Sequence, residues 1–259
     1  MLAPLNRPIP GSQIRAPAGA PGFTLIEMAM VLFILVLVLG SLLVPIATQV
    51  DQRQVSDTQK MLEDIKEALI GHALAKGYLP CPDRTSAGAG TANDTANDGV
   101  EDYNTVTGVC FSTTATGNVP WVTLGLGASD PWGNRFRYRV HTNYAQRAPA
   151  AVFTLSSLTN LTVTATSGGA LLTPASPDGA VAVIISHGKN GFGAMSALTN
   201  TARPAPTSAD ELDNSAGGTS YTSRTITPAD APAGEFDDIV AWIGKFTLFN
   251  RMVAAGKLP

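Results

Sequence analysis

The feature that most constrains this chain of 259 residues is a long apolar run near its amino terminus. No charged side chain occurs from Met28 to Gly40, and after Ser41 the run continues to Val44. As one helix, residues 23–46 would be about 36 Å long, which is enough to cross the hydrocarbon core of a bilayer. The single acid at the start of the run is Glu27. Because a carboxylate close to lipid is costly, we expect Glu27 to have a specific role.

The charges that flank the run predict its orientation. Residues 1–22 contain Arg7 and Arg15 and no acid, and no basic residue follows the run immediately. This asymmetry predicts a single-pass protein of a bacterial inner membrane, with a cytoplasmic amino terminus and a periplasmic globular domain. Two alternatives remain open. A cleaved secretory signal usually has a shorter apolar core, of about 7 to 15 residues. An uncleaved signal anchor fits the length of the run but leaves Glu27 unexplained.

The hexapeptide GFTLIE, residues 22–27, resembles the processing motif of type IV prepilins and of the pseudopilins of type II secretion. The resemblance implies that a prepilin peptidase cuts between Gly22 and Phe23 and that the new amino group of Phe23 is methylated. It also implies that Glu27 faces the amino terminus of a neighbouring subunit during filament assembly. The leader of 22 residues is longer and richer in proline than the leaders of many relatives.

If the chain is cleaved in this way, elementary electrostatics predicts that Glu27 helps to dock a neighbouring subunit. Cleavage places an ammonium group on Phe23, four residues before Glu27, which is the spacing at which helical side chains meet. A charge without a partner is expensive in a medium of low dielectric constant, whereas a paired charge costs much less. A neighbouring subunit can therefore be held in register by this one polar contact.

The rest of the chain predicts a domain of class α+β. We expect a leader at 1–22, a transmembrane half-helix at 23–47, an amphipathic half-helix at 48–76 and a pilin-like globular domain at 77–259. The amphipathic part has an apolar stripe at helical spacing, made by Val55, Leu62, Ile65, Leu69 and Ala73. Candidate strands at 135–140, 152–155, 161–166, 181–186 and 220–227 predict an antiparallel sheet packed on that helix. A second helix is expected from Phe236 towards Ala255.

Two cysteines, Cys81 and Cys110, bracket a long loop rich in Gly, Asn, Asp and Thr. In a domain outside the cytoplasm two thiols most simply form one disulfide. A pair of buried free thiols and half of a metal site are the alternatives.

Three arginines, Arg135, Arg137 and Arg139, alternate with apolar residues in a predicted strand and so share one face. The preceding turn, DPWGN at 130–134, resembles a turn of the major pseudopilins. We expect either a solvated sheet face or a contact with an acidic neighbouring subunit or with DNA.

The segments VAVIISHGKNGFG and EFDDIVAWI also resemble the major pseudopilins, in which a Ser-x-Gly turn and a later pair of acids frame a calcium site. The matching positions are Ser186, Gly188, Asp237 and Asp238. Lys189 and Asn190 replace the acid-rich part of the family pattern. We therefore expect no cofactor and expect the two aspartates to stabilise the start of the last helix, with calcium at these positions as the alternative.

The charge of −3 is too small to predict a nucleic-acid-binding protein, and no GxSxG, HExxH or P-loop pattern occurs. Ser186 and His187 are adjacent, so on a strand they would point to opposite faces. We therefore expect a structural subunit, not an enzyme: a minor pilin or a pseudopilin of a type IV pilus or of a secretion pseudopilus. Its expected partners are the prepilin peptidase and methyltransferase, other subunits and the inner membrane. The alternatives are a module that binds DNA, a surface or secreted cargo, and a membrane-anchored receptor that does not polymerise.

Overall fold

The computed structural model is described over residues 22–86, 95–111 and 115–258, without the side chains of 41–47. The predicted leader therefore lies outside the described residues, apart from Gly22. The chain forms two compact units, residues 1–50 and 51–259. Helix α1, Leu25–Lys76, contributes residues to both units.

The expectation of a half-transmembrane helix is wrong for the part of the chain that the structure describes. No helix there has a stretch that is both long enough and apolar enough to cross a membrane. The first described run of apolar residues in α1 stops at Gly40, and from Leu25 to that residue the helix measures only about 24 Å. A bilayer core is about 30 Å thick.

In the second unit the amphipathic part of α1 follows the predicted pattern. Leu62, Ile65, Leu69 and Ala73 are buried, while the acids and bases between them face outward. The helix ends at Gly77, whose φ of 88° is accessible to glycine without strain and whose amide donates to the carbonyl of Ala73 at 2.8 Å.

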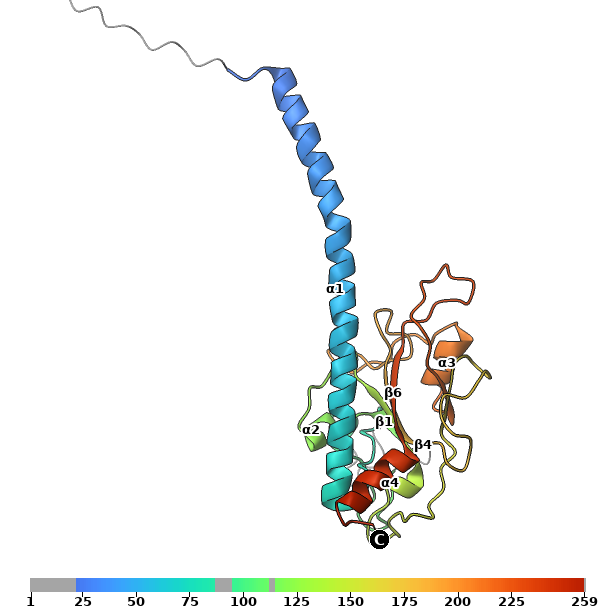
Figure 1. Ribbon diagram of the computed structural model, residues 1–259. Coiled ribbons are helices and arrows are strands. Elements are labelled where there is room, and N and C mark those ends of the chain that lie inside the picture. The colour runs from blue at the N-terminus through green and yellow to red at the C-terminus, as the bar shows by residue number, and fades with distance from the viewer. Residues whose placement is uncertain (1–21, 87–94, 112–114, 259) are drawn as a thin grey trace, which may run out of the picture. The chain divides into compact units, whose positions relative to one another are not determined.

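The main sheet of this unit has four antiparallel strands in the order β1-β2-β4-β6 (Figure 1). The strands are β1 (Thr116–Asn118), β2 (Arg137–Val140), β4 (Ala180–Ser186) and β6 (Ile239–Gly244). A separate parallel pair is formed by β3 (Thr162–Thr164) and β5 (Ser220–Thr222). The remaining helices are α2 (Trp121–Leu124), a 3-10 turn η1 (Thr142–Tyr144), α3 (Ala209–Ser215) and α4 (Lys245–Ala254).

Strand β4 lies between two hydrophobic clusters, and all seven of its residues are buried. On one face Ala182 and Ile184 pack into the core that also contains Leu69 of α1 and Leu248 of α4. On the other face Val183, together with Ile185 and Ala180, packs with residues of β3 and β5. Burial on both faces explains the continuous apolar sequence of this strand.

The predicted carboxy-terminal helix is wrong over its first half. Residues 239–244 form β6, which pairs with β4 in the register Ile184↔Ala241, and helix α4 begins only at Lys245. The apolar residues of this segment suit either period, because alternate residues of β6 contact the two different clusters. Residues 152–155 form no strand, and the strand expected at 220–227 ends at Thr222. The described part of the chain is therefore α+β with an antiparallel sheet, and the predicted membrane span is not found in it.

Candidate functional site

The processing motif forms the start of α1. Thr24 precedes the first helical residue, and its hydroxyl accepts from the amide of Glu27 at 3.3 Å. In return the Glu27 carboxylate accepts from the amide and the hydroxyl of Thr24, both at 2.8 Å. This reciprocal arrangement is a capping box, which satisfies amides that a helix start leaves free. Glu27 therefore has a local role in the uncleaved chain that sequence reasoning missed, although the pattern Thr-x-x-Glu signals it.

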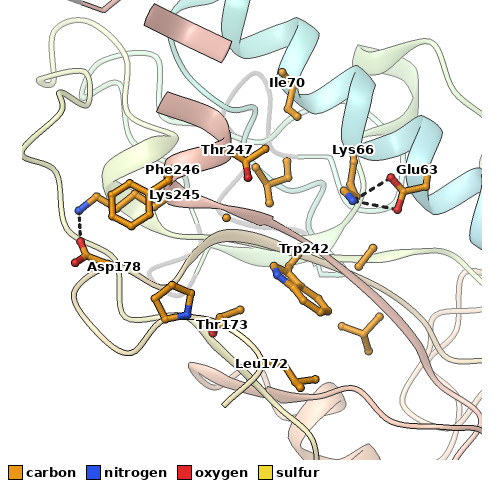
Figure 2. Close-up of a pocket in the computed structure, with 15 residues that line it drawn as sticks. Glu63, Lys66, Ile70, Leu172, Thr173, Asp178, Trp242, Lys245, Phe246 and Thr247 are labelled. Carbon is orange, nitrogen blue, oxygen red and sulfur yellow. Dashed lines mark hydrogen bonds and ion pairs between the residues drawn. The ribbon is translucent and has the colours of Figure 1, made fainter. Parts of the chain in front are cut away.

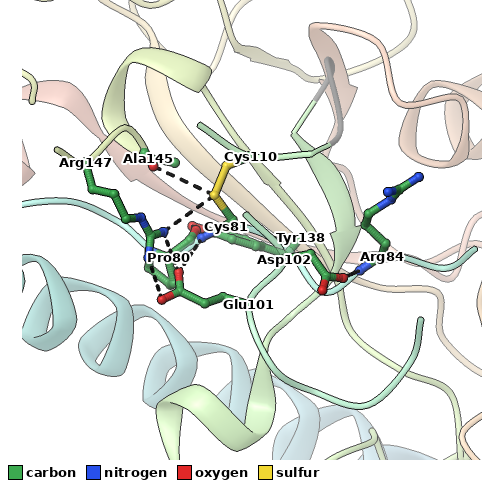
Figure 3. Close-up of a disulfide and its surroundings, with 9 residues drawn as sticks. All are labelled: Pro80, Cys81, Arg84, Glu101, Asp102, Cys110, Tyr138, Ala145 and Arg147. Atoms are coloured by element: carbon green, nitrogen blue, oxygen red, sulfur yellow. Dashed lines mark hydrogen bonds and ion pairs between the residues drawn. A yellow bond between two sulfur atoms is a disulfide. The ribbon is translucent and has the colours of Figure 1, made fainter. Parts of the chain in front are cut away.

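The predicted disulfide joins Cys81 to Cys110, with Cα atoms 5.4 Å apart (Figure 3). A buried ion pair lies beside it. The Arg147 guanidinium donates to both oxygens of Glu101, at 2.7 and 2.6 Å, and Glu101 accepts from the amide of Cys81 at 3.1 Å. The guanidinium also lies over the rings of Tyr78 and Tyr103, at 4.3 and 3.8 Å. These contacts hold the guanidinium of Arg147 between Glu101 and the two tyrosine rings.

A cluster of three acids lies where the calcium site was expected. Oxygen atoms of Glu211, Asp237 and Asp238 come within 4.8 Å of one another, and Oδ1 of Asp237 is buried without a hydrogen-bond partner. Glu211 comes from α3, a helix for which the sequence analysis gave no prediction. The Ser-x-x-Glu pattern at 208–211 could have indicated this helix.

The three acids also bond to one another and to neighbouring groups of the same domain. Glu211 accepts from the amide of Asp237 at 3.1 Å, and Asp237 accepts from the amide of Asn190 at 2.7 Å. Asp238 accepts from Asn214 at 2.8 Å and lies 3.2 Å from Nδ1 of His187. These partners hold the three carboxylates together in a fixed geometry.

Burial and mutual repulsion make the cluster reluctant to ionise. Burial, followed by the charge of Asp238, raises the pKa of Glu211 to about 7. Burial raises the pKa of Asp237 to about 6, and Asp238 adds to the effect. A cation would relieve this repulsion, so the donor set of Glu211, Asp237 and Asp238 fits a hard oxygen-binding ion such as calcium.

Ser186 does not belong to this cluster. Its hydroxyl donates to Asp130 at 2.7 Å, and Asp130 also accepts from the amides of Trp132 and Asn134 in the predicted DPWGN turn. Ser186 and His187 thus contact different acids, Asp130 and Asp238. The DPWGN turn and the segment that carries Ser186 both resembled pseudopilins. They are joined by the hydrogen bond from Ser186 to Asp130, and Ser186 is not placed as a metal ligand.

The arginine face is buried instead of solvated. Arg135 and Arg139 are 6% and 7% exposed, and Arg137 is partly buried between them. Arg135 stacks 3.8 Å over the ring of Trp121 and donates to Asn200 at 2.7 Å. Arg139 donates to Thr116 at 3.1 Å. This placement removes two of the three guanidinium groups from the surface that DNA would contact.

A groove of about 530 Å³ follows the outer edge of β6 (Figure 2). Its walls come from α1, with Lys66 and Ile70, and from the segment around Leu172, while Trp242 projects from the strand. Among the residues that the structure describes, no strand pairs with this edge. The backbone donors and acceptors of alternate residues of β6 are therefore available to an added strand.

We compared the chain with models of known protein families, with curated proteins and with solved structures, and none of the three comparisons found a match.

Proposed function

We propose that this chain is a prepilin-like subunit of an extracytoplasmic filament, either a type IV pilus or a secretion pseudopilus. In this proposal a prepilin peptidase cuts between Gly22 and Phe23, and the subunit assembles through the first part of α1. The disulfide supports a location outside the reducing cytoplasm, because disulfides are rare there.

The observation that carries the proposal is the unburied apolar start of α1. Every side chain described from Phe23 to Leu39 is exposed, including Leu25 at 89% and Phe33 at 68%. Exposed apolar surface of this extent marks an interaction site, and a helix that is apolar on all sides requires neighbours on all sides. A bundle of identical helices supplies them, and Glu27 is the one charge among the described residues of this stretch.

The experiment must separate the charge of Glu27 from its capping role. Glu27→Gln keeps an acceptor that can complete the capping box but removes the charge. Thr24→Ala removes the cap but keeps the charge. If Glu27 answers the ammonium group of a neighbouring subunit, Glu27→Gln should lower the yield of filaments by about tenfold or more, because it leaves a charge without its partner. Thr24→Ala should assemble at close to normal yield.

The outcome is measured as sheared filament protein per cell, with total subunit as the reference. Normal filament yield from Glu27→Gln, with loss in Thr24→Ala, would show that Glu27 only caps the helix. Mass spectrometry of the mature subunit provides the second readout, and it should find a chain that begins at N-methylated Phe23. Gly22→Val should leave the leader attached, and a chain cut at another bond would refute the assigned motif.

The acid cluster adds calcium to this proposal as a structural ligand of the globular domain. Glu211, Asp237 and Asp238 would hold it, and the ion would supply positive charge to a cluster that now repels itself. Ser186, which the sequence suggested, is not needed.

The groove at β6 favours a second candidate function, the binding of an uncharged, extended segment of secreted cargo by strand addition. Both lysines in its lining are neutralised, Lys66 by Glu63 at 3.0 Å and Lys245 by Asp178 at 2.7 Å. Neutral walls and an open strand edge suit an apolar peptide.

Peptides selected from a random twelve-residue library displayed on phage test this candidate. They should slow amide exchange within Ile239–Gly244, and Trp242→Lys should abolish their binding, whereas Leu212→Lys on α3 should not. A selection that enriches no peptide, or peptides that protect another region, would exclude it.

A further inference from the structure

Arg137 and Arg139 lie in β2, and Arg135 precedes the strand. The three arginines differ in their hydrogen bonds. Arg135 and Arg139 each donate a hydrogen bond to a described residue, Asn200 and Thr116 respectively. Arg137 makes no hydrogen bond and no ion pair with any residue that the structure describes, and its Nε is buried without a partner. Burial lowers the pKa of the Arg137 guanidinium, although an arginine remains charged at neutral pH.

Asp238, a described acid that acts on this cation, is already engaged. Asp238 attracts Arg137 from a distance, but its oxygens contact His187 and Asn214. The neighbouring Arg139 repels Arg137 and adds positive potential. A partly buried charge without a counter-ion is strongly unfavourable, so the site lacks a negative group.

A small cavity lies where that group would sit. It has a volume of about 110 Å³, and its lining includes Arg135, Arg137, Asn118, Gly117, Gly193 and Met195. Among the described residues that line it there is no aspartate or glutamate. At roughly 30 Å³ per water molecule, the space equals that of about three or four waters, close to the four oxygens of a tetrahedral anion.

We propose that this cavity binds a small oxyanion, a phosphate or a carboxylate, through the guanidinium of Arg137. The planar fork of arginine matches two oxygens of such a group, which a lysine cannot do. Arg135 is held by Asn200 and Trp121, so it contributes positive charge without turning towards the ligand. The cavity is too small to admit the backbone of a nucleic acid, so the ligand is a single small anion or one acidic group.

The test measures thermal unfolding of the full chain in chloride buffer, with sodium phosphate or sodium acetate added at constant ionic strength. A ligand that binds only the folded state should raise the Tm by about 2 to 4 °C and the rise should saturate. Phosphate and acetate distinguish the two ligand sources. In parallel, the ¹⁵Nε–¹H signal of Arg137 should shift along the same titration curve.

Three variants make the result specific. Arg137→Met should fold and lose the response, and Arg137→Lys should weaken the apparent affinity by about tenfold, because it keeps the charge without the fork. Arg53→Met, on the exposed face of α1, should respond like the wild type. Asp94→Asn addresses an acid outside the described residues, and it too should leave the response unchanged.

Three results would overturn the proposal. The first is a Tm that rises no more with phosphate or acetate than with chloride. The second is an unchanged response in Arg137→Met. The third is a response that appears only in Asp94→Asn, because Asp94 would then be the anion of this site. All of these outcomes are independent of filament assembly, so they leave the proposed function untouched.

Discussion

Asp83 illustrates how burial acts at the scale of one residue. It is fully buried after the end of α1, and one of its oxygens accepts from the amide of Gly99 at 3.2 Å, while Oδ1 has no partner. Burial raises its pKa to about 7, and the charge of Asp102 contributes. The folded state therefore binds a proton between about pH 4 and pH 7 that the unfolded chain releases.

We predict that Asp83→Asn removes part of the pH dependence of stability. Since the folded pKa is raised, the free energy of unfolding falls as the pH rises from about 4 to about 7, by at most about 3 kcal/mol from this group. The asparagine variant lacks that decline. Urea unfolding at pH 4.5 and pH 8 measures the difference, with the exposed Asp98→Asn of the same loop as the control. An unchanged slope in Asp83→Asn would show that the carboxyl is already ionised in the folded state.

At the same scale, sequence reasoning located residues better than it located their surroundings. Cys81 and Cys110 were paired correctly because the cysteines allow only one intramolecular pairing. Arg135, Arg137 and Arg139 were placed on one face of a predicted strand, of which only 137–140 forms β2, and their alternation says nothing about what covers that face. The cover comes from β5 and from the loop that carries Asn200, more than 60 residues further along the chain.

At the scale of elements, the long loop before β1 is fastened by the pair Glu101–Arg147 next to the disulfide. Arg147 is 7% exposed and Glu101 is 9% exposed. Breaking a buried pair leaves a charge without its partner, whereas removing both members can be almost neutral. The loop therefore depends on the two side chains together.

We predict that Arg147→Met destabilises the domain by about 3 to 5 kcal/mol, and that adding Glu101→Gln recovers part of the loss. The matched control is Arg251→Met, which breaks an exposed pair with Glu67 at 3.1 Å and should cost about 0 to 1 kcal/mol. Urea unfolding of the wild type and of the three variants measures the four free energies of unfolding. Equal losses from Arg147→Met and Arg251→Met would contradict the structural role of the buried pair.

The elements also show where a periodic pattern is sufficient. The apolar stripe of α1, from Val55 to Ala73, extends over about five turns, so it predicted both the helix and its buried face. The segment Ile239–Gly244 is short and apolar throughout, and its two faces reach different clusters, so its period is ambiguous. Its pairing with β4, and not its own sequence, makes it a strand.

At the scale of the whole molecule, the disulfide limits the unfolded chain. It closes a loop between cysteines 29 positions apart. We predict that Cys81→Ala/Cys110→Ala lowers the free energy of unfolding by about 3 to 4 kcal/mol, as the chain-entropy model gives for a loop of this length. Urea unfolding measures it, and adding dithiothreitol should weaken the wild type but leave the variant unchanged. A loss below about 1 kcal/mol would mean that the native loop contacts alone restrict the chain.

The three acids come from two segments, α3 and residues 237–238, which meet only in the folded chain, so a cation there should stabilise the whole globular domain. With pKa values of about 7 and about 6, Glu211 and Asp237 are largely protonated at pH 5 and ionised at pH 8. Because calcium binds the ionised form, we predict stabilisation by about 2.7 kcal/mol at pH 8 with calcium at a hundredfold excess over its Kd, and far less at pH 5.

Glu211→Gln should lose most of this stabilisation, whereas Glu235→Gln, which neutralises a neighbouring acid outside the cluster, should keep it. Thermal unfolding in calcium and in a chelator, at both pH values, measures the effect. Equal calcium stabilisation at pH 5 and pH 8, or an unaltered effect in Glu211→Gln, would place the ion elsewhere. No stabilisation at either pH would mean that the three acids only share protons, and that the fold tolerates their repulsion through the donors of Asn190 and Asn214.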